Sequence, residues 1–297
     1  MPETPSADGL GPLGLLAIIA GRGDLPRWIA ERRAAAGLPF LLVVFQNCWE
    51  DWMAGHPHQR HEFERLGAMF RALDQAGATH VVFAGAMNRP KVRLWRADLK
   101  TVKLAGKALA LLSKGDDEML RGYARMIEAE GLVMIGPAEL LGEDMQVQAG
   151  PLGRVALDDR DRADAAKAAQ IVQTLGPLDV GQGAVVAHGV CLAVEAIEGT
   201  DLMLARLADL PAERRASAPP PSGVLFKGPK PGQDRRMDLP TIGPGTVRGA
   251  VAAGLRGIVV AAGETLLMEE AETRRAADEG GIFVVGARPE ELAAWGR

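Results

Sequence analysis

The first half of the chain alternates short apolar runs with stretches of helical periodicity. The apolar runs cover residues 13–20, 38–45, 80–85 and 132–135, and the helical stretches cover residues 25–36, 63–75, 97–112 and 116–130. Runs of this length, apolar on both faces, are typical of buried parallel strands. Their alternation with helices predicts a parallel sheet covered by helices on both faces, which is a Rossmann-like domain.

The second half has shorter elements and more turns. Residues 183–196 are rich in valine and interrupted by a glycine, which predicts two strands that meet at a turn. Further strands are expected at 223–227, 257–262 and 282–285, and further helices at 200–210, 246–253 and 266–278. These elements predict a second α/β domain.

An alanine-rich, charged helix is expected between the two halves, at residues 158–175, and Gly176 and Pro177 end it. It is either the connector or the first helix of the second domain. We therefore predict two α/β domains joined by a linker: a Rossmann-like N-terminal domain at 10–150, a linker and helix at 151–175, and a C-terminal catalytic domain at 176–297.

Composition narrows the class of protein. Hydrophobic residues make up 47% of the chain and aromatic residues only 4%, so the cores must be aliphatic. The net charge of −4 argues against a nucleic-acid partner. The two cysteines, Cys48 and Cys191, have no metal-type spacing and fit a reducing compartment. The sequence has no signal peptide pattern and no apolar run of membrane-spanning length, so we expect a cytoplasmic protein.

A first candidate site follows the first predicted strand. It consists of Gly21, Arg22, Gly23 and Asp24. Glycines between a strand and a helix let the backbone approach a phosphate at the helix N-terminus. A dinucleotide fingerprint would need a third glycine, where Pro26 stands, and an acid after the second strand, which ends in Gln46 and Asn47. Nucleotide binding and a plain tight turn both remain open here.

A second candidate site follows the third predicted strand. Asn88 offers a donor and an acceptor to a base or ribose, and Arg89 offers a fork for phosphate. The helix expected at 97–112 carries lysines along one stripe. Such a helix usually packs on a core with its lysines in water, but it suits an anionic membrane surface if the substrate is a lipid.

The segment at residues 195–201 gathers three acids, of which Glu195 is the first, and a hydroxyl around one turn. Glu198 and Asp201 could face a metal, whereas Thr200 could simply cap the helix that follows or contact substrate. Both interpretations remain open from the spacing alone.

The most informative segment is the loop at residues 227–243. It contains two lysines, two arginines, two aspartates and a glutamine between prolines and glycines: Lys227, Lys230, Gln233, Asp234, Arg235, Arg236 and Asp238. Phosphoryl transfer needs oxygen ligands for Mg²⁺ and cations for phosphate charge, which the aspartates and the basic residues could supply. The apolar residues that follow, next to Thr241, indicate that this loop is anchored rather than fully solvated.

Taken together, these motifs resemble the metal-dependent UDP-2,3-diacylglucosamine pyrophosphatases of lipid A biosynthesis, in the form found in alphaproteobacteria and other bacteria that lack the calcineurin-like enzyme. The resemblance rests on IAGRGDLP, GAMNRP, GDDEMLRG, GQGAVVAHG, EAIEGTD and above all KPGQDRRMDLPTIG. It implies a two-domain fold that holds its substrate between the domains.

The activity implied by this resemblance is hydrolysis to UMP and 2,3-diacylglucosamine 1-phosphate (lipid X), with Mg²⁺ or another divalent cation. It also implies that an aspartate of the QDRRMDLPTIG stretch is essential, and both Asp234 and Asp238 match that stretch. The implied partner is a lipid-linked nucleotide sugar, with peripheral contact to the inner membrane. A homodimer is left open.

Two other interpretations compete with this one. The strand–glycine–helix start is compatible with an NAD(P)-dependent oxidoreductase, although the missing third glycine counts against it. A non-catalytic carrier of a nucleotide sugar or lipid would also explain the candidate binding residues, but it would not need the paired aspartates.

Overall fold

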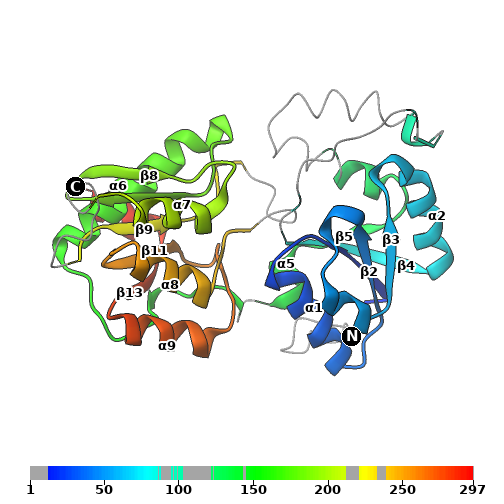
Figure 1. Cartoon of the computed structure of the whole chain (residues 1–297), viewed down its shortest axis with the longest axis horizontal. Coiled ribbons are helices and arrows are strands. Elements are labelled where there is room, and N and C mark those ends of the chain that lie inside the picture. The colour runs from blue at the N-terminus through cyan, green and yellow to red at the C-terminus, as the bar shows by residue number, and fades with distance from the viewer. Residues whose placement is uncertain are drawn as a thin grey trace, which may run out of the picture. The chain divides into compact units, whose positions relative to one another are not determined.

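The computed structural model describes residues 13–85, 87, 95, 97–98, 100–102, 122, 124–142, 145–211, 221–232 and 239–296. These residues form two compact units. Unit 1 contains the described residues up to 142, and unit 2 contains those from 145 onward. Figure 1 colours the chain from blue to green through unit 1 and from green to red through unit 2.

Unit 1 alternates strands and helices along the chain. Its elements are β1 (Leu15–Ala20), α1 (Asp24–Ala35), β2 (Phe40–Phe45), β3 (His58–His61), α2 (Leu66–Ala76), β4 (Ala78–Ala84), β5 (Val133–Met134) and α5 (Pro137–Leu141), with short 3-10 turns η1 (Gln46–Cys48), η2 (Asp51–Gly55) and η3 (Phe63–Arg65).

The strands of unit 1 form a parallel sheet in the order β3-β2-β1-β4-β5. All six residues of β2 are buried, because a central parallel strand is covered on both faces. On one face, Ile19 and Val43 pack with Phe70 and Leu73 of α2. On the other, Ile29 and Ala30 bury the inner side of α1.

Helix α2 shows how the sequence sets a helix end. Its buried residues include Met69, Phe70 and Leu73, which recur at helical spacing along one stripe. The helix ends at Gly77, whose φ of 74° is left-handed and whose amide returns to the carbonyls of Leu73 and Asp74. The chain then enters β4 at the next residue.

Unit 2 is built around a second sheet. Its elements are β6 (Gly150–Pro151), α6 (Asp159–Leu175), η6 (Gly176–Leu178), β7 (Gly183–Ala187), β8 (Val190–Val194), α7 (Gly199–Ala208), β9 (Val224–Lys227), β10 (Thr241–Ile242), α8 (Pro244–Ala252), β11 (Gly257–Ala261), β12 (Leu266–Leu267), α9 (Glu270–Gly280), β13 (Phe283–Ala287) and α10 (Pro289–Trp295).

The main sheet of unit 2 has the order β6-β13-β11-β9-β7-β8. Strands β9, β11 and β13 are parallel, and β7 and β8 form an antiparallel hairpin on one side. Consecutive residues of β9 point to opposite faces of the sheet and pack in different cores. Leu225 packs with α7, α8 and α9, whereas Phe226 packs with α6. Unit 2 is therefore a helix–sheet–helix sandwich (Figure 1).

Helix α6 lies within unit 2 and packs on β7 and β9 through alanines such as Ala165 and Ala168. It begins with a capping box in which Asp158 and Asp161 each accept a hydrogen bond from the other's amide, both at 2.9 Å. Arg256, the residue before β11, forms an ion pair with Asp161, with 2.9 Å between Arg256 Nε and Asp161 Oδ2. These contacts fix the helix against the sheet.

The predicted fold class is confirmed: the chain has two α/β domains, and the first is Rossmann-like with a parallel sheet. The hairpin predicted at 183–196 is present as β7 and β8. Strand β3 was not predicted, because its sequence HQRH is polar at the edge of the sheet.

The helix expected at 266–278 is wrong at its beginning. Leu266 and Leu267 form β12, which pairs with β10, and α9 begins only at Glu270. Backbone pairing beside the loop at 227–243 overrides the helical pattern of these residues. No helix in the described part of the chain is long and apolar enough to span a membrane.

The Asp158 cap yields a prediction of stability. The Asp161 amide and Arg256 lower the pKa of Asp158, so the cap stabilises the fold above about pH 3.9, the ordinary value for aspartate, and is lost as the pH falls further. We expect Asp158→Ala to lower the unfolding free energy by about 1 kcal/mol at neutral pH, measured by urea denaturation.

Asp158→Asn retains the accepting oxygen and is the matched control, with a smaller expected loss. Equal losses for the alanine and asparagine variants would contradict a capping role.

Candidate active site

The strand order of unit 1 changes direction at β1. Strands β2 and β4 flank β1 on opposite sides, so the loops that leave β1 and β4 lie next to each other at the carboxyl edge of the sheet. This is the place where open α/β sheets bind ligands. Candidate residues Gly21, Arg22, Gly23 and Asp24 lie in the loop after β1 and at the beginning of α1.

The two loops are in direct contact. The Gly21 amide donates to the Ala84 carbonyl at 2.7 Å. Gly85 has a φ of 84°, and a Cβ placed there would come within 2.5 Å of the Arg22 carbonyl oxygen. Only glycine therefore permits this approach.

The N-terminus of α1 faces the same loop. Its N-cap, Gly23, has a φ of 99° and provides no side-chain cap, so the first-turn amides and the helix dipole suit an anionic group. Arg22 is exposed, and its Nη2 donates to the Asn47 carbonyl at 3.0 Å. The structure thus brings the β1 loop together with the segment after β2.

Glu50 is a residue of this region that the sequence analysis missed. The Gly23 amide lies 3.5 Å from Glu50 Oε1, and Trp52 donates to Glu50 Oε2 at 2.7 Å. In the sequence, Gln46 and Asn47 stand directly after the second strand, and neither is an acid. Glu50 follows the end of β2 by five residues, and turn η1 lies between them. The turn thereby brings Glu50 to the loop after β1. A carboxylate there suits ligand hydroxyl groups better than phosphate.

A second cluster lies at the carboxyl end of β9 in unit 2. Lys227 Nζ donates to Thr200 Oγ1 at 2.7 Å and to the Thr241 carbonyl at 3.0 Å. Thr200 Oγ1 in turn donates to Glu195 Oε2 at 3.0 Å. Three predicted site residues from α7, β9 and β10 therefore share one network, and Thr200 does not act as the cap of α7.

Glu195 completes this network; it belongs to the predicted acidic segment 195–201, although no role of its own was assigned to it. Two glycines make room for it: a Cβ at Gly183 would lie 2.7 Å from its Oε2, and one at Gly181 would lie 2.2 Å from its carbonyl oxygen. The glycine spacing GQG was visible in the sequence, but its relation to Glu195 depends on the β7–β8 pairing.

The loop at 227–243 is held at both ends. On the first side, Lys230 forms an ion pair with Asp179, and the Lys230 and Asp179 side chains are 10% and 19% exposed. On the other side, Leu239 is buried, and the Pro240 carbonyl accepts from the Leu266 amide at 2.8 Å. The prediction of an anchored loop is confirmed at these flanks.

Several predicted residues lie outside the described part of the chain. These are Asn88 and Arg89 in unit 1 and Gln233, Asp234, Arg235, Arg236 and Asp238 in the loop. Their assigned roles stay predictions, as does the lysine stripe beyond residue 102.

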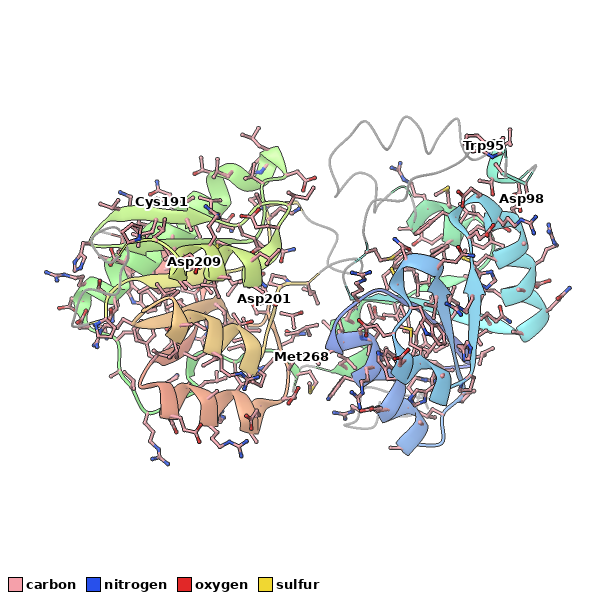
Figure 2. The ribbon with its side chains drawn as sticks, viewed as in Figure 1. Trp95, Asp98, Cys191, Asp201, Asp209 and Met268 are labelled. Carbon is pink, nitrogen blue, oxygen red and sulfur yellow. The ribbon has the colours of Figure 1, made fainter. Side chains whose placement is uncertain are left out.

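Of the four predicted metal ligands, Glu198 and Asp201 are described. Glu198 pairs with Arg206 at 3.0 Å, and Asp201 is exposed in the first turn of α7. Figure 2 labels Asp201 together with Asp209, the residue that follows the other end of this helix. Among the residues that the structure describes, no three His, Cys, Asp or Glu side chains group as a metal site.

Comparison with known proteins covers both units. Residues 15–143 match the family model of the LpxI N-terminal domain, and residues 148–285 match that of the LpxI C-terminal domain. A relative from Caulobacter vibrioides, named UDP-2,3-diacylglucosamine pyrophosphatase LpxI, is 40% identical over 276 residues. The alignment spans 93% of this chain and 98% of the relative.

The contact between Gly85 and the β1 loop yields a prediction. Gly85→Ala must both adopt a left-handed φ and displace the Arg22 backbone, so we expect a loss of unfolding free energy well above 1 kcal/mol. Thermal or urea unfolding measures the loss.

Gly77→Ala is the matched control. Gly77 has a similar φ of 74°, but a Cβ there meets nothing within 4 Å. Its loss should be about 1 kcal/mol, the cost of the backbone conformation alone. Equal losses for the two variants would mean that the close contact between the loops contributes nothing.

Proposed function

The chain belongs to the LpxI family, and from that premise we propose that it hydrolyses UDP-2,3-diacylglucosamine to UMP and 2,3-diacylglucosamine 1-phosphate (lipid X), a step of lipid A biosynthesis. The observation that carries this proposal is the 40% identity to a pyrophosphatase over 93% of the chain. Neither the oxidoreductase nor the non-catalytic carrier has comparable support.

The reaction we propose transfers a phosphoryl group to water. A water oxygen bonds to the phosphorus on the sugar side, and the bond from that phosphorus to the bridging oxygen breaks. UMP leaves with the bridging oxygen, and the attacking water loses a proton. The barrier comes mainly from positioning the water and from stabilising charge on the phosphate oxygens.

The Lys227 network supports a site for this chemistry in unit 2. Thr200 and the Thr241 carbonyl hold the Lys227 ammonium in place, and Glu195 orients the Thr200 hydroxyl. A preorganised cation needs no rearrangement when charge develops on the phosphate. We assign Lys227, Lys230 and Arg235 to the phosphates.

We further propose a dependence on Mg²⁺ or another divalent cation. Asp234 and Asp238 would hold it, because carboxylate oxygens are the ligands that Mg²⁺ prefers. Glu198 is a weaker candidate, because Arg206 already binds its carboxylate. When bound, the cation neutralises charge on the pyrophosphate.

The substrate carries acyl chains, so we propose a cytoplasmic enzyme that contacts the inner membrane peripherally. The nucleotide part of the substrate is water-soluble, whereas its acyl chains favour a bilayer. Co-flotation with anionic liposomes tests this contact, and absence of the protein from the lipid fraction would contradict it.

The metal proposal predicts the outcome of chelation and of two substitutions. We expect EDTA to abolish UMP release and added Mg²⁺ to restore it. Asp234→Asn and Asp238→Asn should each lower kcat about 10²-fold or more. Asp209→Asn, an exposed aspartate after α7, is the control and should retain full activity. Full activity in EDTA would contradict the metal dependence.

The hydrogen bonds around Lys227 predict that two substitutions of Thr200 change kcat to different extents. Thr200→Val keeps the shape of the side chain but removes the hydroxyl that joins Lys227 to Glu195, so we expect kcat to fall about 10- to 100-fold. Thr200→Ser retains the hydroxyl and should retain most of the activity. The same kcat for both variants, at equal thermal stability, would exclude a positioning role.

A further inference from the structure

The short segment between η6 and β7 contacts the beginning of the loop at 227–243. Its first residue, Asp179, forms an ion pair with Lys230, and both side chains are largely buried. Its last residue, Gln182, accepts a hydrogen bond on its carbonyl from the Gly228 amide at 3.0 Å. The segment therefore holds the loop at two points, one through the backbone and one through a charged side chain.

Turn η6 packs closely against the same part of the loop. A Cβ placed at Gly176, the first residue of η6, would lie 2.5 Å from Pro231 Cδ and 3.2 Å from Lys230 Cβ. The turn and the loop therefore touch through backbone that has no room for a side chain at this position. The ion pair joins two segments that packing already holds together.

Asp179 has a left-handed backbone conformation, with a φ of 61° and a ψ of 37°. Among the residues that the structure describes, the others that are not glycine and have a left-handed φ are His188 and Glu269. Both of these are exposed, whereas the Asp179 side chain is 19% exposed. Glycine would adopt this conformation without strain, so what an aspartate adds here is its carboxylate.

The same segment also borders the network around Lys227. A Cβ at Gly181 would lie 2.2 Å from the carbonyl oxygen of Glu195, whose carboxylate ends that network. One stretch of chain therefore contacts the supports of two lysines: Asp179 binds Lys230 directly, and Gly181 packs on the residue behind Lys227. Two ammonium groups held in this way suit a pyrophosphate, which carries negative charge on both phosphates.

We propose that Asp179 is a positioning residue of the hydrolysis, which holds the Lys230 ammonium where it stabilises charge on the pyrophosphate. A lysine side chain has many rotamers, and an ion pair to a largely buried carboxylate restricts them before substrate binds. An ammonium carries three N–H donors, so it can contact a carboxylate and a phosphate oxygen together. This inference rests on the proposed function and adds a residue that acts through Lys230.

The test measures UMP release from UDP-2,3-diacylglucosamine by the full-length protein and its variants. Asp179→Gly removes the carboxylate and suits the backbone conformation, so the fold should be retained. We expect kcat to fall about tenfold with KM nearly unchanged, because a preorganised cation acts mainly on the transition state. Asp179→Asn keeps an accepting oxygen and tolerates the left-handed region, so it should recover part of the activity.

His188→Gly is the matched control. It replaces another left-handed residue by glycine, at the opposite end of β7, and should retain full activity. A double variant separates positioning from a general loss of structure. If Asp179 acts through Lys230, then Asp179→Gly should cause no further loss of kcat in a Lys230→Met background. Losses that multiply in the double variant would overturn the inference.

Reductive methylation followed by mass spectrometry reports on the lysines without turnover. Lys230 should react faster in Asp179→Gly than in the wild type, whereas the reactivity of Lys227 should not change. Equal rates at Lys230 would overturn the claim that Asp179 holds it.

Failure of this inference is distinguishable from failure of the proposed function. Wild-type protein that releases UMP at the same rate as both Asp179 variants would retain the reaction and overturn only the role of Asp179. Wild-type protein that releases no UMP would overturn the proposed function itself, and the role of Asp179 in it.

Discussion

The carboxyl ends of parallel strands lie at one edge of a sheet, and both candidate regions of this chain follow from that constraint. In unit 1 it brings the β1 and β4 loops so close that Gly85 has no room for a side chain. In unit 2 it places Lys227, the last residue of β9, beside α7 and β10. The candidate site residues therefore lie at strand ends and on loops, which the buried apolar strands support.

Lys227 shows what a partly buried cation needs from its surroundings. A partly buried ammonium loses hydration, and hydrogen bonds to Thr200 and to the Thr241 carbonyl offset that loss. Glu195 accepts from the Thr200 hydroxyl and so leaves the lone pairs of that oxygen available to Lys227. The same contacts tie together the elements on either side of the loop at 227–243, so local stability and the position of the cation are coupled.

The sequence predicts the apolar parts of this fold well and the polar parts poorly. The buried strands β1, β2 and β4 and the β7–β8 hairpin were predicted because burial imposes a visible pattern. Strand β3 is polar and has no such pattern. Leu266 and Leu267 form a strand because they pair with β10, which lies 25 residues earlier in the chain. Glu50 was missed for the same reason, because only the fold brings it to the β1 loop. Glu195 stood in a predicted acidic segment, but its contact with Thr200 and Lys227 depends on the fold.

The proposed reaction is hydrolysis of the pyrophosphate of UDP-2,3-diacylglucosamine by attack of water on the sugar-side phosphorus. Its test is a single turnover in ¹⁸O-labelled water, followed by mass spectrometry of both products. Attack at the sugar-side phosphorus places one ¹⁸O atom in 2,3-diacylglucosamine 1-phosphate and none in UMP. Label in UMP would contradict the direction of attack, and the absence of both products would contradict the reaction itself.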